Sequence, residues 1–388
     1  MNQDQPLLEL FNQTRADSEN ICKPLATEDY VVQPIVDVSP PKWHLGHTTW
    51  FFEEFLLTKY LSGYRRFDER YAYVFNSYYE SMGKRVVRTD RGNLSRPSVS
   101  DVYSYRAHVT NAMIQLLYSE PAAEVLEVIE IGIHHEKQHQ ELLLTDIKYI
   151  LGNNPLQPIY GAQKDEVFVE HQPAQMIPIN DGIYHIGHDK DTFCYDNELP
   201  SHRVFVEPYA ISNKLVTNGE WMQFIEDGGY TKVLLWHTEG WDWVQKNDIS
   251  APMYWFNDNG TWSNYLLSGS LEIDKNAAVT HISYYEAFAF AQWKGMRLPT
   301  EFEWEIAQDK FKWGERWEWT ESAYLPYPNY QKPDGALGEY NGKFMVNQKV
   351  LRGSSIATAA NHARPTYRNF FHPYLRWQFT GLRLAQSL

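Results

Sequence analysis

Apolar and polar residues follow two different patterns along the chain, and the pattern changes near residue 152. Before that point, apolar residues recur at helical spacing over long windows, which predicts amphipathic helices. After it come short strand-like runs, turn residues and most of the tryptophans, which predict an irregular α+β domain. We therefore expect a helical domain at 1–152, a linker rich in Gly, Asn and Pro at 153–175, and a second domain at 176–388.

Four helices are predicted in the first domain, at about 7–20, 40–61, 102–118 and 122–151. Ser39 followed by two prolines is a typical start for the second of them. A long loop at 75–98 separates the second helix from the third, and a loop of that length in a compact bundle is usually functional. Together these features predict a four-helix bundle with one long excursion.

The second domain gives weaker local signals. The segment 176–188 alternates apolar and polar residues around an Asn-Asp-Gly turn, which predicts a hairpin. The segment 202–212 predicts another strand pair, and 218–229 and 283–295 predict two short helices that end in glycine.

Composition excludes several classes of protein. Hydrophobic residues make up 43% of the 388 residues and charged residues 22%, which fits a globular chain with a core. The net charge of −14 and the lack of a basic block argue against nucleic acid as a partner. The only cysteines, Cys22 and Cys194, exclude a disulfide framework and a cysteine-rich metal cluster. The start lacks a secretory signal and no stretch of ~18 apolar residues occurs, so we expect a cytoplasmic protein without a membrane partner.

The strongest chemical signal is the helical pair His135 and His139, with Glu136 between them. An i, i+4 spacing puts both imidazoles on one helix face about 6 Å apart, which suits the binding of one metal ion. His47, among aromatic residues on the second predicted helix, is the candidate for a third ligand, and His44 competes with it. We interpret the other nearby histidines as structural or supporting groups: His108 and His134.

The spacing alone leaves the metal open. The sequence HEKQH matches the H-E-x-x-H helix signature of zinc peptidases, with Glu136 as the general base. The third zinc ligand of such enzymes usually lies downstream, where this chain offers only the expected linker. Three neutral histidines equally suit a non-haem iron site with open positions for a thiolate and O₂.

The long loop supplies a tandem pair of tyrosines and four arginines: Tyr78, Tyr79, Arg85, Arg88, Arg91 and Arg96. A tyrosine hydroxyl near a metal can deliver a proton or an electron, and an arginine can bind a substrate carboxylate through two hydrogen bonds. The alternative is a surface loop with solvated charges.

Four stretches together resemble the EgtB family, the sulfoxide synthases of ergothioneine biosynthesis: WHLGHTTWFFEEFLL, FNSYYESMGKRVVRTDRGNLSRPS, HHEKQHQELLLTDIKY and RNFFHPYLRWQFTGLRLA. The first three fall in what looks like a DinB-like four-helix bundle. The second part is similar to the formylglycine-generating-enzyme fold, a C-type-lectin-like domain, at DNELPSHRVFVEPYAISNKLVTNGEWMQFIEDGGY, GMRLPTEFEWE and VLRGSS. The resemblance covers nearly the whole chain and implies an α+β multidomain fold.

The resemblance implies an Fe(II) enzyme with O₂ as co-substrate. Such an enzyme joins the sulfur of cysteine to C2 of the imidazole of hercynine (Nα-trimethylhistidine) and gives hercynylcysteine sulfoxide. The iron ligands implied by the family are His47, His135 and His139. The implied hercynine-binding residues are Gln138 for the imidazole, Asn369 for the carboxylate and Phe370 for the pocket wall, where an aromatic face suits a trimethylammonium group.

The sequence also departs from part of the family. Mycobacterial-type members place an acid where Phe371 stands here, and that acid helps to hold γ-glutamylcysteine. The tandem Tyr78 and Tyr79 resemble the branch that accepts free cysteine, in which one tyrosine of the pair acts near the iron. Arg88 falls where that branch binds the cysteine carboxylate, and Arg85 is a second candidate.

Other functions remain open at this stage. A selenoneine synthase would join a selenosugar to hercynine on a similar scaffold, and an ovothiol-type synthase would act on histidine itself. A DinB-type zinc hydrolase or thiol transferase would use HEKQH without O₂. A binding module would use the lectin-like domain and leave the histidines structural. The sequence leaves the oligomeric state open.

Overall fold

The structure, a computed structural model, describes residues 5–162, 165–169 and 174–388. It divides into two compact units: a helical unit of Met1–Ala162 with Ala357–His362, and a mixed unit of Gln163–Ile356 with Ala363–Leu388. Part of the expected linker, at 163–164 and 170–173, lies outside the described residues. The expected boundaries of the two domains stay a prediction.

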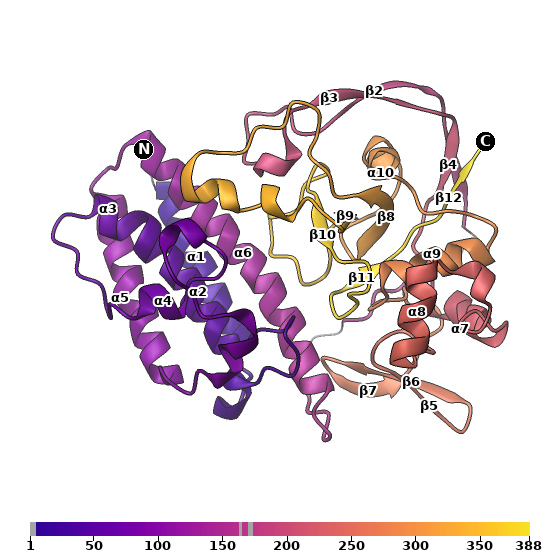
Figure 1. Ribbon diagram of the computed structural model, residues 1–388, viewed down its shortest axis with the longest axis horizontal. Coiled ribbons are helices and arrows are strands. Elements are labelled where there is room, and N and C mark those ends of the chain that lie inside the picture. The colour runs from indigo at the N-terminus through magenta and orange to yellow at the C-terminus, as the bar shows by residue number, and fades with distance from the viewer. Residues whose placement is uncertain (1–4, 163–164, 170–173) are drawn as a thin grey trace. The chain divides into compact units, whose positions relative to one another are not determined.

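The helical unit is built from four long helices, which confirm the four that the pattern predicts (Figure 1): α1 (Gln5–Cys22), α2 (Pro41–Phe52), α5 (Val99–Tyr118) and α6 (Ala123–Gly152). The second predicted helix is not a regular α-helix throughout. Its middle, Glu53–Leu57, is a π-helical turn that joins α2 to α3 (Thr58–Tyr60). Such turns are often found at functional sites. The long loop holds one helical turn, α4 (Tyr71–Val74), and two 3₁₀ turns, Glu80–Met82 and Arg88–Asn93.

Helix α2 is the central element of this unit. All of its residues are buried, so it has no face exposed to solvent and is covered on every side. Two glycines permit the close cover. A Cβ on Gly46 would lie 2.1 Å from the ring of Phe75, and a Cβ on Gly132 of α6 would lie 2.7 Å from the ring of Phe52. Phe75, the residue directly after α4, therefore packs its ring against α2, the helix that carries His47.

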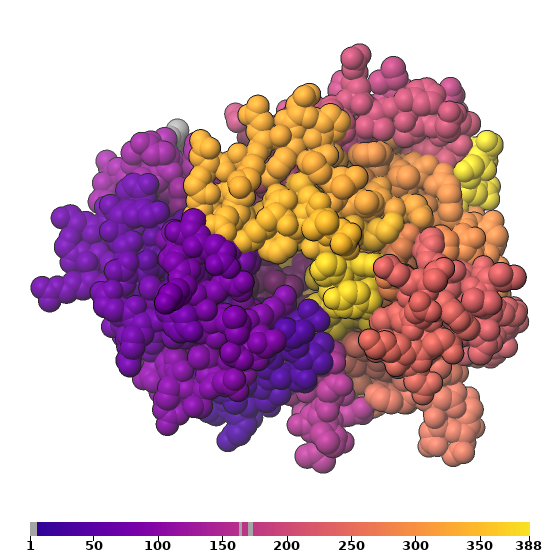
Figure 2. Space-filling model, in the orientation of Figure 1, coloured from indigo at the N-terminus to yellow at the C-terminus, as the bar shows by residue number. Residues whose placement is uncertain are grey.

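The mixed unit contains four small sheets among its described residues, in the strand orders β1-β4-β12, β10-β9-β8-β11, β2-β3 and β5-β6-β7. The strands of its first half are β1 (Met176–Ile179), β2 (Gly182–Ile186), β3 (His202–Val206), β4 (Tyr209–Ser212), β5 (Trp255–Asp258), β6 (Thr261–Leu266) and β7 (Gly269–Glu272). Those of its second half are β8 (Trp317–Ala323), β9 (Lys349–Gly353), β10 (Asn369–Phe371), β11 (Thr380–Gly381) and β12 (Ala385–Ser387). The exposed turn between β5 and β6 projects from the surface of this unit (Figure 2).

The prediction that 176–188 forms a hairpin is wrong, because its two strands do not pair with each other. β1 pairs with β4, and β2 pairs with β3, each in antiparallel register. The two pairings continue one register, so the segment from β1 to β2 lies along the segment from β3 to β4 as one long ribbon. The strands predicted in 202–212 exist, but they do not pair with each other. Alternation along a strand shows which face is buried and does not identify the partner.

The helices of the mixed unit begin at clear sequence signals. α7 (Asn218–Glu226) and α9 (Tyr284–Trp293) confirm the two predicted helices, and each begins at a capping box. The pattern missed α8 (Thr238–Asn247) and α10 (Glu301–Ala307), although α10 also has a capping box, formed by Thr300 and Glu303. No helix among the described residues is long and apolar enough to cross a membrane.

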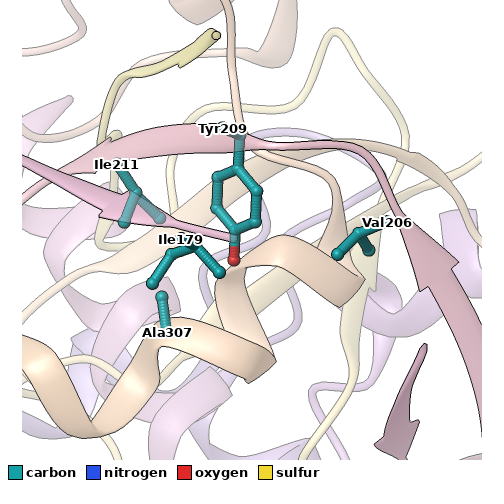
Figure 3. Close-up of a cluster of buried hydrophobic side chains, with 5 residues drawn as sticks. All are labelled: Ile179, Val206, Tyr209, Ile211 and Ala307. Atoms are coloured by element: carbon teal, nitrogen blue, oxygen red, sulfur yellow. The ribbon is translucent and has the colours of Figure 1, made fainter. Parts of the chain in front are cut away.

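A small hydrophobic cluster joins the strand ribbon to α10 (Figure 3): Ile179, Val206, Tyr209, Ile211 and Ala307. The hydroxyl of Tyr209 donates to the backbone oxygen of Glu303 at 2.7 Å, so its polar atom is satisfied inside the cluster. This contact attaches the first strands of the mixed unit to the helix that precedes β8.

Candidate metal centre

Three histidines from two helices meet inside the helical unit. His47 lies on α2, and His135 and His139 lie one turn apart on α6. One ring nitrogen of each lies within 4.8 Å of the other two. The ring centroids are separated by 5.0 Å (His47 and His135), 4.8 Å (His47 and His139) and 4.7 Å (His135 and His139). This is the arrangement that three imidazoles need to bind one ion.

His47 is fixed on all sides. Its Nδ1 donates to the backbone oxygen of Phe75 at 2.7 Å. Trp43 and Trp50 stack on its ring, at centroid distances of 4.7 Å and 5.5 Å. Its Nε2 is buried and has no hydrogen-bond partner among the residues that the structure describes. Because Nδ1 holds the proton, Nε2 presents a lone pair, as metal-binding histidines do.

The surroundings keep the three imidazoles neutral. Burial lowers the pKa of His135 to about 3, and it lowers the pKa values of His47 and His139 well below their usual range. A neutral imidazole is the form that binds a metal. The donor set of three histidines fits a borderline divalent ion with open positions, such as zinc or ferrous iron.

His44 lies beside this cluster and contacts it through one ligand. Its Nδ1 is 2.9 Å from Nδ1 of His139, and its Nε2 is 3.0 Å from Oδ2 of Asp146. Oδ2 of Asp146 also accepts the backbone N–H of Ser39 at 2.8 Å. The structure therefore places His44 between His139 and a carboxylate.

The carboxylate of Glu136 is engaged elsewhere in the bundle. Arg15 of α1 donates to Oε2 at 2.9 Å, Arg106 of α5 donates to Oε1 at 3.0 Å, and Ser18 donates to Oε1 at 2.7 Å. Glu136 is fully buried, and the two guanidinium groups hold its pKa at about 2 against the opposing effect of burial. Both oxygens of Glu136 are thus engaged by donors from α1 and α5, and its low pKa makes it a weak base, which disfavours a role as a general base.

The tandem tyrosines approach the centre through Trp50. The ring of Tyr79 is fully buried and lies 5.5 Å from that of Trp50, which stacks on His47. Tyr78 is partly exposed and stacks on Tyr79 at 4.6 Å. Both side chains therefore belong to one aromatic group next to His47.

The arginines of the loop differ in burial. Arg85 forms a surface ion pair with Glu80 at 2.8 Å. Arg88 is exposed and donates to the backbone oxygen of Asp37 at 2.6 Å. Arg91 is only 5% exposed, lies 3.4 Å from the ring centroid of Trp43, and burial lowers its pKa well below the usual range.

Arg91 lies against Trp43, whose ring stacks on His47. Its two terminal nitrogens donate to the hydroxyls of Ser39 (2.8 Å) and Ser77 (3.0 Å). Its Nε is buried without a hydrogen-bond partner among the described residues. A buried guanidinium with neutral hydroxyl contacts is suited to an incoming anion.

The other predicted site residues lie in different surroundings. Gln138 precedes His139 on α6 and is partly exposed. Asn369, Phe370 and Phe371 form β10 of the mixed unit and are half-buried. Phe370 stacks on Tyr324 at 4.1 Å, so its ring already has an aromatic neighbour.

The segment 357–362 belongs to the helical unit and lies along α6. Thr358 donates to Glu141 at 2.6 Å, and Lys137 donates to the backbone oxygen of Ala360 at 3.1 Å. His134 contacts His362 through the Nδ1 atoms of both rings at 3.0 Å. His108, by contrast, is exposed and contacts the backbone oxygen of Arg65. His134 thus supports α6 and His108 lies apart from the cluster.

Sequence reasoning missed Asp146, and it did not single out Arg91 among the four arginines of the loop. A signal existed for Asp146, because His135, His139 and Asp146 are spaced by four and seven residues and so share one helix face. No sequence signal separates Arg91 from its neighbours Arg85 and Arg88, since burial alone distinguishes them.

Two domain families match the chain. The DinB superfamily matches residues 10–143, and the sulfatase-modifying factor enzyme 1-like domain matches residues 163–316. The expected fold class, a DinB-like helical bundle followed by a formylglycine-generating-enzyme-like domain, is thereby confirmed.

Two hercynine oxygenases match most of the chain, and a formylglycine-generating enzyme matches part of it. A hercynine oxygenase from Mycobacterium tuberculosis is 31% identical over 350 residues, which cover 78% of this chain and 81% of the relative. A hercynine oxygenase from Mycolicibacterium thermoresistibile is 28% identical over 410 residues, covering 90% and 87%. A formylglycine-generating enzyme from Thermomonospora curvata is 31% identical over 159 residues, covering 36% and 52%.

The contacts of Glu136 predict that Glu136→Gln is a structural lesion. Neutralising a buried carboxylate between two guanidiniums should lower the free energy of unfolding at pH 7 by about 3–5 kcal/mol. The pKa of Glu136 in the fold, about 2, lies below its ordinary 4.5. Its contribution is therefore complete above the ordinary value and is lost as the pH falls through the folded value. Denaturant unfolding followed by circular dichroism, at pH 7 and at steps below pH 5, measures both effects.

Glu127→Gln is the matched control, because Glu127 is exposed on the same helix. It should change stability by no more than about 0.5 kcal/mol. An intact fold in Glu136→Gln, with loss only of a hydrolytic activity, would contradict the structural role.

Proposed function

Since the chain belongs to the hercynine oxygenase family, we propose that it joins the sulfur of cysteine to C2 of the hercynine imidazole to give hercynylcysteine sulfoxide. The net reaction consumes one O₂. The C2–H and S–H bonds break and a C–S bond forms, one oxygen atom becomes the sulfoxide oxygen, and the other leaves as water with the two hydrogens. The thioether sulfur and C2 are oxidised, and O₂ is reduced by four electrons.

The observation that best supports the proposal is the neutral three-histidine cluster. His47, His135 and His139 would hold Fe(II), and the buried Nε2 of His47 is the atom that fits a metal ligand. When bound, ferrous iron supplies open coordination positions and the redox chemistry of O₂. The engagement of Glu136 by Arg15 and Arg106 favours this function over a zinc hydrolase that needs a free general base.

Three residues are proposed to bind hercynine. The amide of Gln138 would hydrogen-bond the imidazole and orient C2. The amide of Asn369 would bind the carboxylate, and the ring of Phe370 would face the trimethylammonium group, which is attracted to an aromatic face. Phe370 lies in an aromatic stack with Tyr324 and Phe344, which keeps its ring orientation fixed.

Cysteine recognition is proposed to involve the arginines of the long loop. Arg88, with Arg85 as a second candidate, would attract the carboxylate from the exposed side. Arg91 is the better candidate for direct contact, because its buried guanidinium has no carboxylate partner among the described residues. The aromatic Phe371, in place of an acid, supports cysteine over γ-glutamylcysteine as the donor.

The hydroxyl of Tyr78 or Tyr79 is proposed to deliver a proton while O₂ is reduced. Tyr79 is buried next to Trp50, and Tyr78 stacks on Tyr79, so both rings belong to the aromatic group beside His47, which supports this role. A phenol has a proton to give, which makes a tyrosine hydroxyl a suitable general acid.

The donor assay tests the proposed function. The protein is loaded with Fe(II) without oxygen and then exposed to O₂ with hercynine plus cysteine, γ-glutamylcysteine or a selenosugar in separate tubes. Mass spectrometry should detect hercynylcysteine sulfoxide in the cysteine tube alone. His139→Ala should abolish it, and His108→Ala, which removes an exposed histidine, should not.

Each other outcome has a clear meaning. A γ-glutamyl product alone would refute the choice of donor, and a selenium adduct alone would identify a selenoneine synthase. The absence of any O₂-dependent product, with zinc bound as purified, would overturn the function.

The tyrosine role predicts a change of product. Replacing the acting tyrosine by phenylalanine removes one hydroxyl and should shift the product from the coupled sulfoxide toward cysteine sulfinic acid. The ratio of the two products in Tyr78→Phe and Tyr79→Phe is read by mass spectrometry. Unchanged ratios in both single variants would exclude a role for this pair.

The burial of Arg91 predicts that it controls cysteine affinity. Loss of a charged hydrogen bond should raise the KM for cysteine by about 10- to 100-fold in Arg91→Met, with a smaller effect on kcat. Arg91→Lys keeps the charge, so its KM for cysteine should lie between those of the parent protein and Arg91→Met. Arg85→Met is the control at a surface ion pair and should leave KM within about twofold. An unchanged KM in Arg91→Met would return the role to Arg88.

A further inference from the structure

A histidine that binds a metal through one nitrogen must keep its proton on the other, and a hydrogen-bond acceptor near that second nitrogen fixes the choice. His47 meets this requirement through a backbone carbonyl, that of Phe75. His139 has a different partner, the side chain of His44. An imidazole can accept or donate, so the direction of this contact depends on what lies beyond it.

The contact beyond His44 is the carboxylate of Asp146. Oδ2 of Asp146 accepts the backbone N–H of Ser39 at 2.8 Å, so this oxygen acts as an acceptor. Nε2 of His44, 3.0 Å from the same oxygen, must therefore be the donor. In the tautomer with its proton on Nε2, His44 presents a lone pair at Nδ1. The 2.9 Å contact between the two Nδ1 atoms then requires the proton of His139 to sit on Nδ1.

The surroundings leave few alternatives for this chain of contacts. His44 is 3% exposed and Asp146 is 2% exposed, so bulk water does not replace either partner. A buried carboxylate is costly unless it is hydrogen-bonded, and Ser39 and His44 both contact Oδ2 of Asp146 at hydrogen-bond distance. His139 and Asp146 lie seven residues apart on the same face of α6, so one rigid helix sets the distance that His44 of α2 spans.

We propose that His44 and Asp146 are positioning residues that hold His139 in the Nδ1–H tautomer and so direct its Nε2 toward the metal. The carboxylate also makes His139 a more basic ligand than His47, whose partner is an uncharged carbonyl. The inference rests on the proposed metal site, although it does not depend on the substrate or the product of the reaction.

Two pairs of variants test it. His44→Leu removes the acceptor, whereas His44→Asn keeps an amide oxygen close to the position of Nδ1. Asp146→Leu removes the carboxylate, whereas Asp146→Asn keeps an oxygen for Ser39 and His44. His108→Leu is the control, because that histidine is exposed, contacts the rings of Tyr64 and Phe67 and the backbone oxygen of Arg65, and lies apart from the three-histidine cluster.

The readouts are metal affinity and a spectrum, measured on the full chain. Anaerobic titration with Fe(II), and with Co(II) for its visible absorption bands, should show a 10- to 100-fold weaker affinity in the two leucine variants. The cobalt bands should shift in the leucine variants, and the two amide variants should stay within a few-fold of the parent. The thermal midpoint of the metal-free proteins identifies any variant that merely fails to fold.

Unchanged affinity and cobalt bands in a folded His44→Leu would overturn the proposal. Equal losses in His44→Leu and His44→Asn would overturn it too, because only the leucine lacks an acceptor. A parent protein that binds metal in this way but forms no sulfoxide would refute the proposed function alone. If the parent forms the sulfoxide but the variants of His44 and Asp146 bind metal with unchanged affinity, the positioning role alone is refuted.

Discussion

The carboxylate of Glu136 lies between two buried guanidinium groups, and the arrangement of the helical unit depends on this contact. Arg15 brings in α1 and Arg106 brings in α5, while Glu136 itself belongs to α6. Arg106 also donates to the backbone oxygen of Leu45, which ties α2 to the same point. None of these charges can be buried alone, so the four helices must meet in one relative rotation. That rotation points His135, one residue before Glu136, toward His47.

Helix α6 thus serves three purposes on three faces. One face, with His135, His139 and Asp146, contains two proposed ligands and the carboxylate that supports one of them. A second face holds the ion network. The third contacts residues 357–362, a short segment from far along the chain that completes the helical unit. The burial of this first face keeps the imidazoles neutral and able to bind a cation.

Several features were predictable from the sequence, and the resemblance to the EgtB family is confirmed by relatives that match most of the chain. The four long helices and the spacing of His135 and His139 follow from local periodicity. The partners of β1 and β2 did not, since both possible pairings satisfy the same alternation. The H-E-x-x-H match was ambiguous for a similar reason, because a motif specifies spacing and leaves the partners of its glutamate open.

The sequence by itself determined where the helices lie and which histidines share a face, because both depend on residues within a few turns of one another. Only the tertiary structure determined that Glu136 is bound by Arg15 and Arg106, and that His44 stands between His139 and a carboxylate. It also determined that Arg91, among similar arginines, is the buried one. Each of these outcomes depends on contacts between distant segments. Burial and hydrogen-bond direction arise only when those segments pack together.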